Sequence, residues 1–243
     1  MDFMDDRLRR KLIKRRGRLH VFDQLIAAKT AVIVIDLTQP IYDAMPSGTA
    51  LIEPVNRLTE AARRADVVVA WIAPVPPSRS KSRTQARLLL GDESMQRHEV
   101  EVANRAPARG LTVADSDWQI DKTSYSAFFP GNSALPERLA EAGIDTVILA
   151  GVLTDLCVAS SARDAFESGY RVLVCSDGVA ANEELLHAMT LRTLARGYAD
   201  VRPSGELAEL LASAVQLQQV IYRCGAVAAI SSPIQVLPSM PRG

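Results

Sequence analysis

Three residues of different chemistry come shortly after apolar runs of this 243-residue chain. Asp36 follows the run AVIVI, Lys122 comes two residues after the weaker run WQI, and Cys157 comes after the run TVILA. A cysteine can act as a nucleophile, a lysine ammonium can stabilise its thiolate, and a carboxylate can carry the thiol proton to a leaving group. Each residue alone has an ordinary explanation as a turn residue, a solvated lysine or a small core residue. Their combination favours a site for nucleophilic catalysis.

Cys157 lies where a strand pattern changes into a helix pattern. The apolar run ends at Ala150 and Gly151, and helical periodicity begins at Leu156. The free N–H groups and the positive dipole end of a helix favour a thiolate. We therefore predict that Cys157 is reactive and that its thiolate form is favoured. Cys175, inside an apolar strand, and Cys224, near the C-terminus, are interpreted as inert.

Short apolar strands alternate with helices along the chain. The predicted strands are 31–35, 67–72, 118–120, 146–150, 171–175 and 199–201, and the predicted helices are 50–64, 135–142, 156–168, 183–196 and one from residue 206. This alternation is typical of βαβ units, in which a parallel sheet is covered on both faces. Ligands bind such sheets outside the carboxyl ends of the strands. We therefore expect one α/β domain in which Asp36, Lys122 and Cys157 meet at that edge.

Three segments flank or interrupt the predicted core domain, residues 21–213. Residues 1–20 form an arm with eight basic residues between Arg7 and Arg18, interpreted as a solvated arm or a helix packed on a neighbouring subunit, because charge runs are usually solvated. Residues 74–110 are a long polar insertion that predicts either a lid or a disordered loop. Residues 214–243 contain apolar stretches, which predict packing on the domain or on a neighbouring subunit.

Composition excludes several classes of protein. Lys plus Arg (28) equals Asp plus Glu (28), so no net charge favours nucleic acid, and no apolar run is long enough to cross a bilayer. The three cysteines are widely spaced and form no disulfide framework. The sequence predicts a cytoplasmic protein that binds neither nucleic acid nor a membrane.

Four motifs occur in a fixed order. They are VIVID ending at Asp36, DKTSYSAFF from Asp121, AGVLTDLCVASSARDAF from Ala150, and GYRVLVCSDGVA from Gly169, with His187 following in the next helix. With these motifs the chain resembles the isochorismatase-like cysteine hydrolases. That superfamily includes nicotinamidases, N-carbamoylsarcosine amidases, ureidoacrylate amidohydrolases and isochorismatases. The resemblance spans residues 21–210 approximately.

This resemblance implies a fold and a catalytic triad. The fold is a Rossmann-like three-layer αβα sandwich with a six-stranded parallel sheet. The triad falls on Cys157 as nucleophile, Asp36 as proton shuttle and Lys122 as charge stabiliser. A cis peptide bond is expected between Val152 and Leu153, so that the backbone N–H groups of Leu153 and Cys157 stabilise an oxyanion.

The resemblance also implies a reaction. The expected activity is hydrolysis of a C–N bond in a small amide, carbamoyl or ureido compound through a thioester, with no cofactor, in a dimer or tetramer. Isochorismatases that cleave a vinyl ether do not use a cysteine nucleophile, so Cys157 favours C–N hydrolysis. Two alternatives remain: a catalytically inactive binding or scaffold protein of the same fold, and a vinyl-ether or ester hydrolase.

The residues around the predicted triad depart from the family pattern. Asp36 is followed by Leu-Thr-Gln-Pro-Ile, where many members have Met-Gln-Asn-Asp-Phe. The candidate substrate contacts are Tyr125, Gln39, Trp71 and Phe128, although core packing is an equal alternative for Trp71 and Phe128. No metal site is expected, because the three histidines lie far apart in the sequence. His187 is interpreted as structural.

Overall fold

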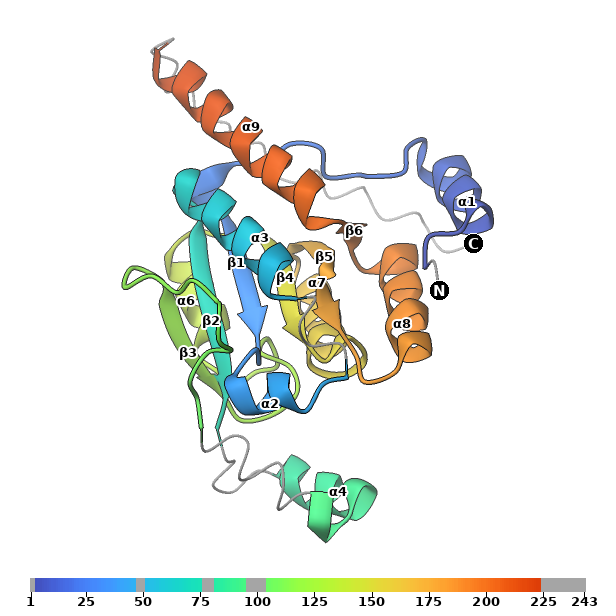
Figure 1. Ribbon diagram of the computed structural model, residues 1–243. Helices are drawn as coiled ribbons and strands as arrows, with labels where there is room; N and C mark the ends of the chain where they lie inside the picture. The colour runs from blue at the N-terminus through green and yellow to red at the C-terminus, as the bar shows by residue number, and fades with distance from the viewer. Residues whose placement is uncertain (1–2, 47–50, 76–80, 95–103, 224–243) are drawn as a thin grey trace, which may run out of the picture.

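The computed structural model of the chain describes residues 3–46, 51–75, 81–94 and 104–223 (Figure 1). Helices and strands alternate over this length. In chain order they are α1 (Asp6–Arg16), η1 (Ala27–Lys29), β1 (Thr30–Ile35), α2 (Gln39–Asp43), α3 (Ile52–Arg64), β2 (Val68–Pro74), α4 (Lys81–Leu90), β3 (Trp118–Lys122), α6 (Leu135–Glu141), β4 (Thr146–Val152), η3 (Thr154–Val158), α7 (Ala159–Glu167), β5 (Arg171–Ala180), α8 (Glu184–Gly197), β6 (Asp200–Arg202) and α9 (Ser204–Arg223).

The six strands form one sheet in the order β3-β2-β1-β4-β5-β6, and every neighbouring pair is parallel. The chain builds the sheet outward from β1 in one direction and then, starting with β4, in the other. In a doubly wound sheet, the crevice at this reversal is where ligands bind. The carboxyl ends of β1 and β4 therefore flank the expected site.

The two faces of the sheet carry separate cores. Successive side chains of a strand point to opposite faces. Accordingly, Ala31, Ile33 and Ile35 of β1 pack with apolar residues of α1, α6, α7 and α8, whereas Val32 and Val34 pack with residues of α3 and α9. Figure 1 shows α3 and α9 side by side over one face. The predicted three-layer α/β fold with a six-stranded parallel sheet is confirmed.

The element that carries Cys157 differs from the prediction. In place of one α-helix over 156–168, a π-helix (η3) runs over Thr154–Val158 and an α-helix (α7) follows over Ala159–Glu167. The residue before η3, Leu153, is extended, and its carbonyl accepts the N–H groups of Leu156 (3.2 Å) and Val158 (3.1 Å). The residues that lead from β4 to the helix are thus fixed by short-range backbone bonds.

The basic arm folds onto its own chain. The side chain of Asp5 caps α1 by accepting the Leu8 N–H at 2.7 Å, and Leu8 and Leu12 are buried in the core that α8 shares. Asp5 also pairs with Arg192 of α8 at 2.8 Å. The two leucines form an apolar stripe that is covered within the same chain, while most of the basic side chains of α1 are exposed.

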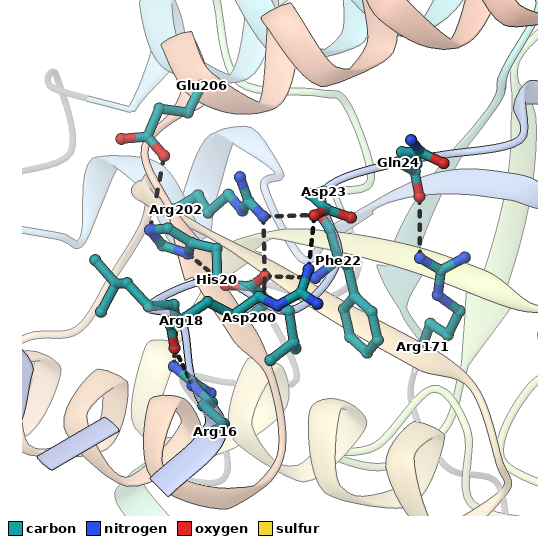
Figure 2. Close-up of polar contacts among 12 residues, drawn as sticks. Arg16, Arg18, His20, Phe22, Asp23, Gln24, Arg171, Asp200, Arg202 and Glu206 are labelled. Atoms are coloured by element: carbon teal, nitrogen blue, oxygen red, sulfur yellow. Dashed lines mark hydrogen bonds and ion pairs between the residues drawn. The ribbon is translucent and has the colours of Figure 1, made fainter. Parts of the chain in front are cut away.

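A buried carboxylate at the start of β6 holds the chain that follows α1 (Figure 2). Asp200 is 1% exposed, and its carboxylate accepts the N–H groups of Val21 (2.9 Å) and Phe22 (3.1 Å). His20 Nδ1 lies 2.5 Å from it and Arg202 lies at 3.1 Å. Burial alone would raise the pKa of Asp200, but these hydrogen bonds and charges outweigh it and lower that pKa.

The polar insertion returns to the sheet beside the residues that follow β1. Thr38 forms an antiparallel bridge with Pro107, Gln39 donates its N–H to the Ala106 carbonyl (2.8 Å), and Ala108 donates to the Leu37 carbonyl (3.0 Å). The parts of the predicted insertion at 76–80 and 95–103, and residues 224–243 with Cys224, lie outside the described residues. Among the described helices, none combines the length and the apolar character needed to cross a bilayer.

Candidate active site

Asp36 ends β1 in an unusual backbone conformation. Its φ is 55°, in the left-handed region, where aspartate is tolerated better than most residues other than glycine. Its N–H donates to the Ile72 carbonyl at 2.8 Å, which keeps this residue hydrogen bonded to the neighbouring strand β2. The side chain is 4% exposed. The end of β1 therefore places a buried carboxyl group beside the crevice at the reversal of the sheet.

Lys122 connects β3 to this carboxylate across the intervening strand. β3 and β1 are separated by β2, so their backbones lie about 10 Å apart, two strand spacings. The long lysine side chain covers this separation: Nζ lies 2.7 Å from Asp36 Oδ2, and both side chains are almost fully buried. Nζ also donates to the carbonyl of Ser124 at 2.9 Å. A shorter cation on β3 would not reach Asp36.

The same ammonium group contacts the sulfur of Cys157. Lys122 Nζ lies 3.5 Å from Cys157 Sγ, and the thiol is also hydrogen bonded to Asp36. Cys157 is half-buried within η3, just past the carboxyl end of β4. The structure thus brings together the three residues that the sequence singled out from the ends of β1, β3 and β4.

A glycine allows β4 to end this close to β1. Gly151 has a φ of 105°, and a Cβ built on it would lie 2.0 Å from the Ile35 carbonyl oxygen and 2.5 Å from the Ile35 nitrogen. No side chain fits in that space, so the chain can turn toward Cys157 here only with glycine. The peptide bond between Val152 and Leu153, which follows this glycine, is cis.

The electrostatic balance of the site favours a neutral thiol in the free protein. Burial, the largest cause, and the charge of Asp36 together raise the pKa of Cys157 to about 12, although Lys122 acts in the opposite direction. The prediction that the thiolate is favoured is therefore wrong, because desolvation and a neighbouring carboxylate outweigh the ammonium. For Lys122, burial lowers the pKa, but the charge of Asp36 and the hydrogen bond to it act in the opposite direction and the net shift is upward, so the lysine is charged.

Serine side chains fix the segment that follows Lys122. Ser161, fully buried on α7, accepts the N–H of Ala127 at 3.0 Å, and the Ser126 hydroxyl accepts the N–H groups of Phe128 (3.1 Å) and Phe129 (3.2 Å). Sequence reasoning did not single out either serine. Their occurrence inside the two motifs that also hold Lys122 and Cys157 was the available signal.

Two of the candidate substrate contacts are polar residues outside the core. Tyr125 is 41% exposed, and partial burial raises its pKa. Gln39 donates to Asp43 at 2.6 Å and accepts the N–H of Arg109 at 2.6 Å. Its amide thus holds α2 against the returning end of the insertion.

The two other candidates are core residues. Trp71 is 6% exposed and donates from Nε1 to Asp117 at 2.8 Å, on the face of the sheet covered by α3 and α9. Phe128 is 3% exposed, and its ring lies 5.5 Å from the ring of Tyr170. The structure therefore gives both side chains the packing role that was the alternative to ligand contact. Within the described part of the chain, no three His, Cys, Asp or Glu side chains cluster in a way that could hold a metal ion.

Comparison with known proteins identifies the family. Residues 30–206 match the model of the isochorismatase domain. The chain belongs to the isochorismatase family. It is 41% identical over 87 residues to nicotinamidase 3 of Arabidopsis thaliana, a match that covers 36% of this chain and 43% of that protein. The chain thus spans less than half the length of that relative.

Solved structures share the fold of this isochorismatase-family chain. A cysteine hydrolase from Pseudomonas syringae pv. phaseolicola superposes with a TM-score of 0.67 and 24% identity, over 78% of this chain and 95% of that one. N-carbamoylsarcosine amidase from Thermoplasma acidophilum superposes with a TM-score of 0.58 and 25% identity, over 72% of this chain and 96% of that one. Both matches cover nearly the whole of the solved chain, so the likeness extends over the complete fold.

Proposed function

We propose that this hydrolase cleaves a C–N bond of a small amide, carbamoyl or ureido compound through a thioester on Cys157, with no metal ion in the reaction. The observation that carries the proposal is the position of Lys122 Nζ, 2.7 Å from Asp36 Oδ2 and 3.5 Å from Cys157 Sγ. A nucleophile, a proton carrier and a fixed positive charge are thereby in mutual contact at the ligand-binding edge of the sheet.

Acylation begins with the neutral thiol. As Sγ bonds to the substrate carbonyl carbon, the thiol proton passes to Asp36 along their hydrogen bond, and an electron pair moves to the carbonyl oxygen. The N–H groups of Leu153 and Cys157 stabilise this oxyanion. When the C–N bond breaks, Asp36 returns its proton to the departing nitrogen, which leaves as ammonia or an amine.

Deacylation repeats these proton transfers with water as the nucleophile. Asp36, ionised again, accepts a proton from a water molecule while the water oxygen bonds to the thioester carbon. The C–S bond then breaks, and the sulfur takes the proton back from Asp36, so that the free acid leaves and the thiol is restored. Lys122 keeps its proton throughout, because the charges beside it raise its pKa. Its ammonium offsets the negative charge of Asp36 and the charge that develops on the sulfur as the C–S bond breaks.

Two of the relatives have names that fit this chemistry. A nicotinamidase and an N-carbamoylsarcosine amidase, to judge by their names, act on C–N bonds. An inactive scaffold would have no need to bury an ion pair against a thiol, because buried charges carry a desolvation cost that only good pairing offsets. We expect Tyr125, an exposed side chain three residues past Lys122, to contact the substrate.

A substrate panel tests the proposal. Ammonia or amine release is measured for amides, carbamoyl compounds and ureides, with isochorismate as the vinyl-ether arm. We expect turnover of at least one C–N substrate and none of isochorismate, and a loss of at least about a thousandfold in kcat for Cys157→Ala. The matched control is Cys175→Ala, a second buried cysteine on β5, which should keep turnover. Turnover that survives in Cys157→Ala, or turnover of isochorismate alone, would overturn the proposal.

A further inference from the structure

The imidazole of His187 contacts the first residue of the π-helix that carries Cys157. His187 Nδ1 lies 3.0 Å from the hydroxyl oxygen of Thr154. Thr154 is fully buried and begins η3, three residues before the sulfur, while His187 belongs to the first turn of α8. A hydrogen bond therefore joins α8, an element with no residue in the triad, to the turn that presents Cys157.

The side chain of Leu153 packs against the core just before η3, and the hydrogen bond of Thr154 adds a polar contact at its start. Leu153, at the N-cap position, makes no side-chain cap, and the local bonds to its carbonyl come from within the same turn. The Thr154 hydroxyl, which could have capped the helix, bonds to His187 instead. A π-helix is also uncommon and is found mostly at functional sites, where it needs support from its surroundings. The contact with α8 supplies such support from outside the turn.

His187 is not required to hold α8 in place. Leu191 and Leu194, one and two turns further along the helix, are fully buried in the core, and Arg192 pairs with Asp5 at 2.8 Å. The imidazole stands on a helix that is fixed independently of it. The imidazole can therefore fix the position of the turn, while other residues of α8 stabilise the fold.

The imidazole at this position is neutral at neutral pH. Burial lowers the pKa of His187, although the nearby Asp155 acts in the opposite direction. A neutral imidazole has one donor and one acceptor nitrogen, so its Nδ1 can exchange a hydrogen bond with a threonine hydroxyl in either tautomer. The contact thus persists over the pH range in which the thiol of Cys157 is neutral.

We propose that His187 is a positioning residue: through the hydroxyl of Thr154 it fixes the turn that holds the Cys157 sulfur against Lys122 and Asp36. The proposal rests on the proposed function, in which Cys157 is the nucleophile. A turn released from His187 would still contain the thiol, but it would hold the sulfur less firmly at the distance that proton transfer to Asp36 requires.

The test compares variants at both ends of the hydrogen bond. His187→Ala and Thr154→Val, which is nearly isosteric, should each lower kcat about tenfold and leave KM within about twofold. The double variant should be no slower than either single one, because both remove the same contact. His187→Asn, whose amide can take the place of Nδ1, should restore most of kcat. The matched control is Met189→Ala, a change of an exposed side chain (52%) on the same turn of α8.

A second measurement needs no substrate. Alkylation of Cys157 by iodoacetamide at pH 8, located by peptide mass mapping, should become several-fold faster in His187→Ala and Thr154→Val, because a looser turn exposes the thiol to water. If His187 only stabilised the fold, His187→Ala would lower the melting temperature, but it would not lower kcat while raising the alkylation rate of Cys157. If His187→Ala fails to fold, Thr154→Val and His187→Asn carry the test.

The outcomes separate the two proposals. Unchanged kcat and unchanged alkylation in both single variants, or losses that multiply in the double variant, would overturn the positioning role alone. Turnover in Cys157→Ala would overturn the proposed function instead, whatever the His187 variants show.

Discussion

Two of the buried carboxylates that pair with a cation have different surroundings. Asp200 is 1% exposed, next to Arg202 and His20, and Asp36 is 4% exposed, next to Lys122. Asp200 is the first residue of β6, at the amino end of the sheet, whereas Asp36 comes just past the carboxyl end of β1. Buried ion pairs therefore occur at the amino ends and at the carboxyl ends of the strands. A carboxylate buried beside a cation does not by itself identify a catalytic site.

The difference lies in the third group that each carboxylate contacts. Asp200 accepts the backbone N–H groups of Val21 and Phe22, whose protons do not leave. Asp36 contacts the thiol of Cys157, whose pKa is raised to about 12 and whose proton can be transferred when a new bond to sulfur forms. The first arrangement stabilises one ionisation state and joins the arm to the sheet. The second arrangement makes proton transfer possible, and we interpret it as catalytic.

The largest expected effect comes from Asp36→Asn. Turnover should fall by about a thousandfold or more, because no group would then accept the thiol proton. Alkylation of Cys157 at pH 8 should become faster, since the charge of Asp36 raises the pKa of the thiol and its removal leaves Lys122 to favour the thiolate. The measurements are ammonia release and iodoacetamide labelling of the Cys157 peptide. If both rates fall together, or turnover persists, Asp36 does not exchange a proton with Cys157.

A smaller effect, on stability alone, is expected for Asp200→Asn. The free energy of unfolding in urea should fall by about 2–3 kcal/mol, because several buried donors lose a charged acceptor. Turnover should stay within about twofold of wild type. The matched control is Asp23→Asn, an exposed carboxylate (63%) that pairs with Arg18 at 2.7 Å and should change stability by less than about 0.5 kcal/mol. A large loss of turnover in a folded Asp200→Asn protein would remove the contrast between the two regions.

The smallest expected effect is on acid stability. The folded pKa of Asp200 is below its usual value of 3.8, so its stabilising contribution is complete above that value and disappears as the pH falls through the folded pKa. The stability difference between wild type and Asp200→Asn should therefore be constant from pH 7 to about pH 5 and shrink below about pH 4. Urea titrations at pH 7, 4 and 2.5 measure it. A difference that stays constant down to pH 2.5 would contradict the lowered pKa.

The sheet and the three reactive residues could be predicted because they depend on local patterns. Apolar runs mark the strands, and parallel strands bring their carboxyl ends to one edge, so Asp36, Lys122 and Cys157 had to lie near one another. The strand order and the distances could not be predicted, since they depend on long-range packing. The same holds for the left-handed backbone of Asp36 and for the π-helix, which no propensity in the sequence marks.

Other features were mispredicted for identifiable reasons. The pKa of Cys157 depends on how deeply the sulfur is buried, which the sequence pattern does not reveal, and desolvation exceeds the effect of a helix end. Leu8 and Leu12 are two of three apolar residues in a basic run, yet they suffice to bury one side of α1. His187 was interpreted as structural from its helix neighbours, and its hydrogen bond to Thr154, 33 residues earlier in the chain, is a long-range contact that no local pattern shows.

The central claim is that Cys157 forms a covalent intermediate with the substrate carbonyl. Rapid acid quenching of a turnover reaction, followed by intact-mass measurement and peptide mapping, tests it directly. The account predicts a mass increase equal to the acyl group, located on the Cys157 peptide and absent in Cys157→Ala. Steady turnover with no acyl group on Cys157, in the wild type or in a variant that slows deacylation, would contradict it.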